Sequence, residues 1–315
     1  MKKLLYIGNI GLDHVYWNHN GKESHGPGGA VYYGVGAAAK VANQNVDIEL
    51  VTKVGSQEKT ECLEKCLEEL WMYGVKLNVH RVGRTHALKV TYPTANKAKR
   101  RIVQTGFCEP YQLGDMPQGF GAKYAHLICL AGNTDIEFPV SFIEDLANQG
   151  YQGRMAIDMQ CLIRHVMRNG EIRNRDVPQK KHICNIVGTV KMDDAEANLL
   201  MGTKDMAEAS SIAIKKWGCR RVIITSTPSN GVYVSVGKER YFARFSDGEH
   251  PGRNGRGDTT FAAGLVALEE GYNVRDSARF AAAVASIKLE SPPGAFDSTF
   301  SQVIQRMRHI PAEPF

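Results

Sequence analysis

The residues best suited to chemistry lie in one glycine-rich stretch, residues 252–264, which reads GRNGRGDTTFAAG. Glycines followed by an Asp/Thr cluster and small apolar residues are typical of a helix N-terminus. Unpaired backbone N–H groups and the positive end of the helix dipole meet at such a turn, so it suits an anion. Asp258 would repel a phosphate beside it, which favours a role as general base toward a hydroxyl that attacks phosphorus. The alternative is that Asp258 only caps the helix.

A second carboxylate follows the first predicted strand, residues 3–7. This strand runs into the loop GNIGLD, which ends at Asp13, and α/β proteins place ligands at such strand ends. Asp13 can accept hydrogen bonds from two sugar hydroxyls, although an Asx turn would also account for it. Further on, Gly28 and Gly29 precede the small apolar run AVYYGVGAAAKVA, which predicts a tightly packed helix.

Two more polar clusters follow predicted strands. Asp158, Gln160 and Arg164 come at the end of residues 155–158, where they suit contact with a substrate or a phosphate. A salt bridge that ties the loop explains them equally well. Asp193 and Glu196 open a predicted helix and form a possible metal cluster, while acidic residues in a first turn also simply stabilise a helix start.

These stretches, taken in order, resemble the motifs of the ribokinase-like (PfkB) kinases. The family's G-A-G-D signature corresponds to Gly255, Arg256, Gly257 and Asp258, with Arg256 in place of the usual alanine. The resemblance implies that Asp258 is the catalytic base and that the backbone of this turn holds the developing charge. It also implies that the substrate is a small sugar, polyol or nucleoside and that the phosphate donor is ATP with Mg²⁺.

The same resemblance implies a set of binding residues. The substrate contacts would come from Asp13, Gly28, Gly29, Tyr33, Asp158, Gln160 and Arg164. The ATP contacts would come from Thr225, Asn230, Gly231, Ala283 and Ser286. Glu196 would organise Mg²⁺, with Asp193 in place of the family's asparagine. The sequence departs from the family at Tyr33, which replaces an asparagine, and in the loop 225–231, which lacks the first glycine of the phosphate-binding motif.

The order of the predicted elements is that of an α/β protein. Apolar runs predict strands at residues 47–54, 125–130, 155–158, 183–187 and 221–225, and alternating segments predict a hairpin at 232–236 and 240–245. Helical spacing is found at 57–73, 139–148 and 277–289. The resemblance implies one ribokinase-like domain over residues 1–315. Its three-layer α/β/α sandwich would have a mainly parallel sheet and a β lid from about 14–27 and 85–107.

Composition limits the remaining classes. The 315 residues are 43% hydrophobic, enough for a large core, and no run of ~18 apolar residues predicts a membrane span. The beginning reads as a strand rather than a secretory signal, and seven scattered cysteines without a C-x-x-C favour reduced thiols in the cytoplasm. The net charge of +6 is too diffuse to indicate a nucleic-acid surface.

We therefore expect an ATP-dependent phosphotransferase with an alcohol group as acceptor and a small-molecule substrate. A homodimer formed through the lid is a further expectation. One alternative is a catalytically weak or inactive protein of the same fold that binds or senses a ligand. Another is cell adhesion through the tripeptide Arg256-Gly257-Asp258, which a helix-entry position argues against.

Overall fold

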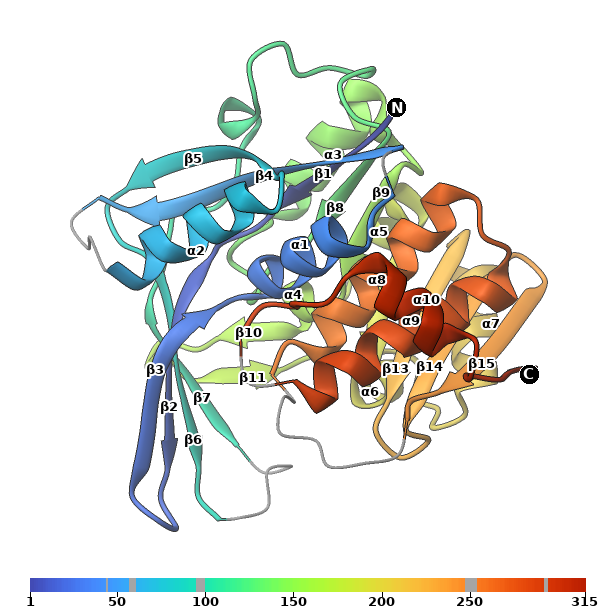
Figure 1. Cartoon of the computed structure of the whole chain (residues 1–315). Coiled ribbons are helices and arrows are strands. Elements are labelled where there is room, and N and C mark those ends of the chain that lie inside the picture. The colour runs from blue at the N-terminus through green and yellow to red at the C-terminus, as the bar shows by residue number, and fades with distance from the viewer. Residues whose placement is uncertain (44, 57–60, 95–99, 247–253, 292–293) are drawn as a thin grey trace.

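The computed structural model describes residues 1–43, 45–56, 61–94, 100–246, 254–291 and 294–315. A ten-stranded sheet forms the centre of this part of the chain, in the order β16-β15-β14-β13-β12-β9-β8-β1-β4-β5 (Figure 1). The strands from β13 to β5 in this order pair in parallel, and β14, β15 and β16 continue the sheet antiparallel. The strands are β1 (Lys2–Ile7), β4 (Val46–Gly55), β5 (Lys76–Val82), β8 (Leu127–Leu130), β9 (Met155–Asp158), β12 (Gly188–Asp193), β13 (Arg221–Ser226), β14 (Gly231–Val236), β15 (Glu239–Arg244) and β16 (Ala312–Pro314).

Helices cover both faces of this sheet, so the predicted three-layer α/β/α architecture is confirmed. In β1, Leu4 and Tyr6 face one apolar core while Leu5 and Ile7 face the other, as expected for a parallel strand buried on both sides. The first core includes α1 (Ala30–Val41), α2 (Glu61–Met72), α8 (Arg256–Glu270), α9 (Val274–Glu290) and α10 (Phe300–Met307). The second includes α3 (Val140–Leu146), α5 (Lys180–Val187), α6 (Asp194–Met201) and α7 (Met206–Trp217).

A four-stranded sheet projects from the main body (Figure 1). Its order is β3 (Lys22–Gly28), β2 (Gly11–Trp17), β6 (His86–Tyr92) and β7 (Arg101–Gly106), and β2 pairs with β6 in parallel. The segments expected to form a lid, about 14–27 and 85–107, lie in this sheet, apart from 95–99, which are outside the described residues. We call this sheet the lid from here on. The short strands β10 (Arg164–Val166) and β11 (Ile172–Asn174) pair beside it, and Val103 of β7 bridges to Glu171.

One predicted element is wrong. Residues 183–187 were expected to form a strand, but they end the helix α5. Ile183, Cys184, Ile186 and Val187 are buried, and their spacing places them on one helical face. The strand β12 begins only at Gly188, whose φ of 84° ends the helix. The strand β5 and the helices α7 and α10 were not predicted from the sequence.

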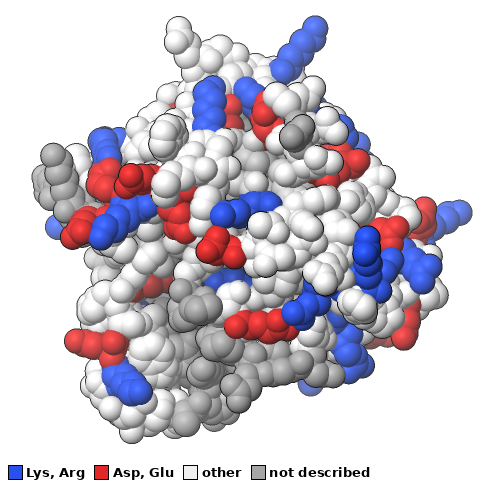
Figure 2. Space-filling view, viewed as in Figure 1, with Lys and Arg blue, Asp and Glu red and all other residues white. Residues whose placement is uncertain are grey.

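Three further predictions concern membrane-spanning helices, the distribution of surface charge and the state of the cysteines. No helix within the described residues is long and apolar enough to cross a bilayer. Lys and Arg side chains are interspersed with Asp and Glu on the face shown in Figure 2, in line with the diffuse charge expected from the sequence. The seven cysteines are all free thiols, and all but Cys62 are buried.

Candidate active site

The predicted helix start at residues 252–264 is the N-terminus of α8, and residues 252 and 253 lie outside the described residues. Gly255 is the N-cap residue, with a left-handed φ of 74°. A methyl group added at Gly255 would lie 2.2 Å from Cγ of Tyr33, so both the backbone angle and the neighbouring ring require glycine. The first-turn N–H groups have no intrahelical acceptors, which makes this turn an anion-binding position.

Asp258 lies in the first turn of α8 but is not the N-cap. Its Oδ1 accepts a hydrogen bond from Nε2 of Gln160 at 3.4 Å. The same Nε2 donates to the backbone oxygen of Gly132 at 3.0 Å. Gln160 therefore connects the α8 turn to the loop that follows β8, and Asp258 keeps its position at the open end of the helix.

Asp13 lies on β2, where the lid meets the main body. Its Oδ1 atom is buried and has no hydrogen-bond partner among the described residues. A methyl group at Gly28 would lie 2.2 Å from Cγ of Asp13, so the first glycine of the pair gives the carboxylate room. Burial raises the pKa of Asp13 to about 6, the cations Arg164 and Arg100 oppose this rise, and Asp258 adds to it. Asp13 and Asp258 are therefore close enough to sense each other's charge.

Asn133, which was not predicted from the sequence as a site residue, lies next to Gly29. Gly29 is the N-cap of α1, and the next residue, Ala30, donates its N–H to Oδ1 of Asn133 at 2.9 Å. Nδ2 of Asn133 lies 3.5 Å from the place of a Cβ on Gly29. Since Asn133 follows Gly132, one continuous wall leads from Asp13 through the glycine pair to the contact between Gln160 and Asp258. Tyr33 packs on Gly255 beside this wall, and burial raises its pKa, with a further rise from Asp13 and Asp258.

A buried lysine lies beneath the α8 turn, also unnoticed in the sequence. Lys191 of β12 is 4% exposed, and its Nζ donates to Oδ2 of Asp158 at 2.9 Å. The same Nζ lies 3.2 Å from the place of a Cβ on Gly257. Burial lowers the pKa of Lys191, but the carboxylates around it, first Asp158 and then Glu196, outweigh burial and raise it. The turn therefore has an ammonium group beside it, and Asp158 is paired with that ammonium.

The predicted metal residues form a capping box at the start of α6. Oδ1 of Asp193 accepts the N–H of Glu196, and Oε2 of Glu196 accepts the N–H of Asp193, both at 2.8 Å. Glu196 is 2% exposed, and burial, together with Asp193, raises its pKa to about 7 while Lys191 lowers it. One oxygen of each carboxylate remains outside the box. Such oxygen ligands suit Mg²⁺, which usually keeps several waters, so the pair fits a water-bridged ion shared with phosphates.

The predicted donor loop is a tight hairpin turn between β13 and β14. Thr225 is buried, and Asn230 has a left-handed φ of 47°. The N–H of Thr227 donates to Oδ1 of Asp194 at 3.1 Å, and its hydroxyl accepts from Nη2 of Arg256 at 3.0 Å. Arg256, which replaces the usual alanine, therefore ties this loop to the α8 turn.

Ala283 and Ser286 differ from the expectation of direct ATP contact. Both lie in the core of α9, at 0% and 1% exposure. The hydroxyl of Ser286 accepts the N–H of Ser246 at 2.9 Å and donates to the backbone of Ala282. Their side chains are enclosed by protein, so a nucleotide would have to contact α9 through other residues.

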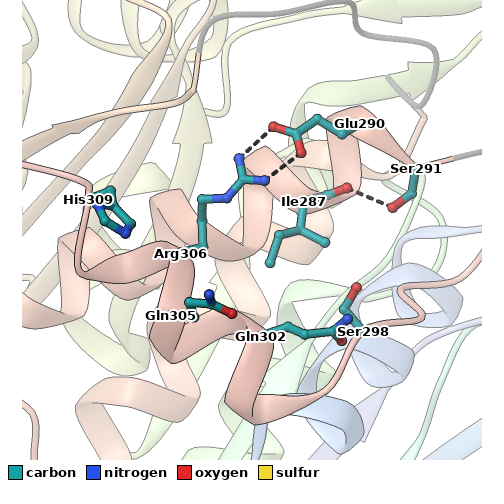
Figure 3. Close-up of a pocket in the computed structure, with 8 residues that line it drawn as sticks. All are labelled: Ile287, Glu290, Ser291, Ser298, Gln302, Gln305, Arg306 and His309. Atoms are coloured by element: carbon teal, nitrogen blue, oxygen red, sulfur yellow. Dashed lines mark hydrogen bonds and ion pairs between the residues drawn. The ribbon is translucent and has the colours of Figure 1, made fainter.

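An open groove of about 420 Å³ runs between the end of α9 and α10 (Figure 3). Arg306 and Glu290 form a bidentate ion pair at this groove, with Nη1–Oε1 and Nη2–Oε2 distances of 2.6 and 2.7 Å. Arg306 also donates to the hydroxyl of Ser246. We call this space the α9–α10 groove. It is lined by Ile287, Glu290, Ser291, Ser298, Gln302, Gln305, Arg306 and His309.

Among the described residues outside this region, a group of metal-ligating side chains lies on the lid. His14, Glu23 and His25 place ligand atoms within 4.8 Å of one another. The two imidazole rings are stacked, with centroids 3.9 Å apart and planes at 23°. Neighbouring residues of a strand face opposite sides, so His14 lies on the face of β2 away from Asp13.

Comparison with known proteins agrees with this geometry. Residues 155–299 match the family described as pfkB family carbohydrate kinase. The chain is similar to a pyrophosphate-dependent kinase of the ribokinase family in a sulfate complex, with a TM-score of 0.81 and 24% identity over 96% of this chain and 99% of that chain. A structure of a pyrophosphate-dependent kinase in the ribokinase family with a pyrophosphate analog and myo-inositol gives 0.79 and 23% over 96% and 99%. Arabidopsis thaliana ribokinase with ribose and ATP gives 0.71 and 17% over 98% and 99%. No curated protein sequence matches the chain.

At these identities the solved structures show the fold, and the family match adds the class of enzyme. The pfkB family consists of carbohydrate kinases, which are phosphotransferases that act on hydroxyl groups. The residues it matches include Lys191, Glu196 and Asp258. The resemblance that the sequence motifs indicate is thereby confirmed: residues 155–299 match the pfkB carbohydrate kinase family, and the chain has the fold of ribokinase-family kinases.

Proposed function

We propose that this protein transfers the γ-phosphate of ATP to a hydroxyl of a small sugar, polyol or nucleoside, with Asp258 as general base. The observation that carries the proposal is the arrangement of Asp13 and Asp258. One carboxylate, Asp13, lies near the start of the lid strand β2 and suits hydroxyl binding. The other, Asp258, stands at an anion-binding helix turn, and its charge raises the pKa of Asp13.

In the proposed mechanism, the acceptor lies along the wall formed by Asp13 and the glycine pair. Its reacting hydroxyl gives its proton to Asp258 while the oxygen forms a bond to the phosphorus and the bond to the leaving phosphate oxygen breaks. Backbone N–H groups of the α8 turn and the ammonium of Lys191 stabilise the charge on the phosphoryl oxygens. Magnesium, held through water by Asp193 and Glu196, would neutralise further charge on the donor.

The α9–α10 groove supports ATP as the donor. It lies at the end of α9, the helix that carries Ala283 and Ser286, for which the family resemblance implies ATP contacts. Ile287 offers it an apolar surface, and Glu290 and Arg306 offer polar contacts.

Pyrophosphate is a second candidate donor. Two solved structures to which this chain is similar are of pyrophosphate-dependent kinases. The specific observation that favours this donor here is the enclosure of Ala283 and Ser286, together with two cations, Lys191 and Arg256, at the α8 turn. A compact anion with high charge density suits such a turn without any contact to a base.

A catalytically inactive ligand-binding protein is the alternative function. It is favoured by Tyr33, which replaces the family's asparagine and packs its ring against Gly255, and by the tight turn at 227–230. Such a protein would bind the donor and show no turnover with any acceptor.

The deciding experiment measures ADP release from ATP and orthophosphate release from pyrophosphate, with Mg²⁺, against a panel of sugars, polyols and nucleosides. Asp258→Asn is the matched variant because it keeps the shape of the side chain and removes the base. We expect one acceptor class to give turnover that falls by at least about 10²-fold in the variant. Near-normal turnover of Asp258→Asn would refute Asp258 as base. Donor binding without turnover across the panel would support the inactive alternative.

A further inference from the structure

Three side chains that can bind a metal ion lie on one face of the lid. In the antiparallel pair of β2 and β3, His14 lies directly opposite His25. Glu23 lies two residues before His25, and residues two apart on a strand point to the same side of the sheet. We call these three residues the lid cluster. Because β3 is at the edge of this sheet, the cluster connects an edge strand to its neighbour (Figure 1).

The ligand atoms of the lid cluster are close together. Nε2 of His14 lies 3.3 Å from Oε2 of Glu23, and the ligand atoms of all three residues lie within 4.8 Å of one another. Two atoms bound at about 2.0–2.2 Å to a tetrahedral zinc ion are roughly 3.3–3.6 Å apart. His14 and Glu23 already have this separation, and a third ligand at 4.8 Å has to approach them by at most about 1.5 Å. Rotation of the exposed His25 ring about χ2 is a soft motion that permits this approach.

A stacked histidine pair without a metal is the alternative interpretation. The centroids of the two rings lie 3.9 Å apart with planes at 23°, and the contact of His14 with Glu23 explains the position of that carboxylate. This alternative gives His25 only a ring contact, since its nitrogens make no hydrogen bond to another described residue. A neutral imidazole keeps one nitrogen lone pair for a ligand, and a metal ion can take the place of the proton between His14 and Glu23.

The donor atoms of the lid cluster select the kind of ion. Two imidazoles and one carboxylate suit Zn²⁺, Cu²⁺ and Ni²⁺, whereas Mg²⁺ and Ca²⁺ prefer oxygen ligands alone. Two histidines and a glutamate are a ligand set that zinc uses in proteins, with water in the fourth position. The side chains of His14 and Glu23 are 33% and 58% exposed, so an ion and its water can reach the cluster from solvent.

We propose that His14, Glu23 and His25 bind a divalent ion of the zinc class, which joins the edge strand β3 to β2. Water completes the coordination, so the ion is held at the surface of the lid. The strand fixed in this way ends at Gly28, the first glycine of the pair that precedes α1. His14 and Asp13 are neighbours on β2 and face opposite sides. The metal site is therefore separate from the site proposed for phosphate transfer, and the inference does not depend on that function.

The first test titrates Zn²⁺ into the whole protein in a calorimeter, with Mg²⁺ in excess to occupy oxygen sites such as Asp193 and Glu196. We expect Zn²⁺ to bind, and its affinity to fall by at least about tenfold in Glu23→Gln and in His25→Ala. Both residues are exposed, so these variants keep the core intact. His19→Ala is the matched control and should bind Zn²⁺ as the wild type does, because His19 is exposed between β2 and β3 and is outside the lid cluster. No Zn²⁺ binding, or equal binding by the wild type and His25→Ala, as expected for an ion held by thiols, would overturn the inference.

The second test measures amide hydrogen exchange in the lid with and without Zn²⁺. Zn²⁺ should slow exchange in β2 and β3 of the wild type and of His19→Ala, and should have no effect in His25→Ala. A stacked pair without a metal predicts a different result, in which His25→Ala alone speeds exchange and Zn²⁺ changes nothing in the wild type. That result would overturn the inference. Neither test uses a phosphate donor or an acceptor, so the metal site and the kinase function can each fail while the other stands.

Discussion

At the scale of single residues, the carboxylates of Asp258 and Asp13 lie in environments with opposite effects on a negative charge. Asp258 stands at the positive end of α8, where the helix dipole favours an anion. Asp13 is enclosed between the lid and the main body, and burial raises its pKa to about 6. The carboxylate of Asp13, proposed to bind hydroxyls, is therefore charged only at an energetic cost.

That cost gives a prediction for Asp13→Asn. A carboxylate whose pKa is raised on folding from 3.8 to about 6 stabilises the folded state only at low pH and loses about 3 kcal/mol as the pH rises between these values. Asparagine removes the charge, so the variant should unfold at higher urea than the wild type at pH 7.5, and the difference should vanish near pH 4. Activity should be lost. Lower stability of the variant at pH 7.5 would show that contacts of the carboxylate with Arg164 or Arg100 outweigh burial.

The role of Lys191 beside the α8 turn, the proposed phosphate site, could not be predicted from the sequence. Lys191 lies in an apolar strand, and its role depends on Asp158, which lies directly beside it in the parallel pair of β12 and β9. That register joins residues 33 positions apart. Asn133 is different, because it follows the buried strand β8 immediately. The rule that ligands bind beyond the carboxyl ends of parallel strands could have identified it.

At the scale of elements, local signals were reliable where the chain itself supplies the cause. Glycines and first-turn acids predicted the start of α8, and the spacing of Asp193 and Glu196 predicted α6, whose capping box lies within one turn. The segment 183–187 failed because a short apolar run fits a buried strand and one face of a helix equally. Gly188, which separates α5 from β12, was the signal that decides between them.

The α8 turn gives the prediction at this scale. Gly255→Ala should lose donor binding, because alanine is strained at a φ of 74° and its methyl group would clash with the ring of Tyr33. Gly271→Ala is the matched control, since Gly271 ends the same helix at a φ of 93° and has open space around the place of its Cβ. Both variants should lose roughly 1 kcal/mol of stability from strain. Only Gly255→Ala should weaken pyrophosphate or ATP binding in calorimetry, and equal weakening in both would argue against the turn as the phosphate site.

At the scale of the whole molecule, the two ends of the reaction come from different parts of the chain. Asp13 and the glycine pair, which are proposed to bind the acceptor, precede residue 155. Lys191, Glu196 and Asp258, proposed to handle phosphate, lie within the residues that match the family. Phosphate transfer needs the same cationic and carboxylate groups whichever acceptor is used, whereas the lid and the loop after β8 have to fit one particular substrate. This division explains why the motifs predicted a kinase more firmly than they predicted its acceptor.

The α9–α10 groove decides between the two donors, because none of its lining residues belongs to either set. Gln305 is an exposed residue of α10 that lines the groove, so Gln305→Trp should fill the space without disturbing the core. Ser301→Trp, at an exposed position of the same helix outside the lining, is the matched control. If ATP is the donor, Gln305→Trp should raise the KM for ATP by roughly tenfold while kcat changes little, because the nucleoside contributes binding that is equal in ground and transition states. Turnover with pyrophosphate should be the same in both variants, since that donor has no nucleoside to place there. An unchanged KM for ATP in Gln305→Trp would exclude the groove as the nucleoside site and, with Ala283 and Ser286 enclosed, would leave pyrophosphate as the donor that the α8 turn and Lys191 suit.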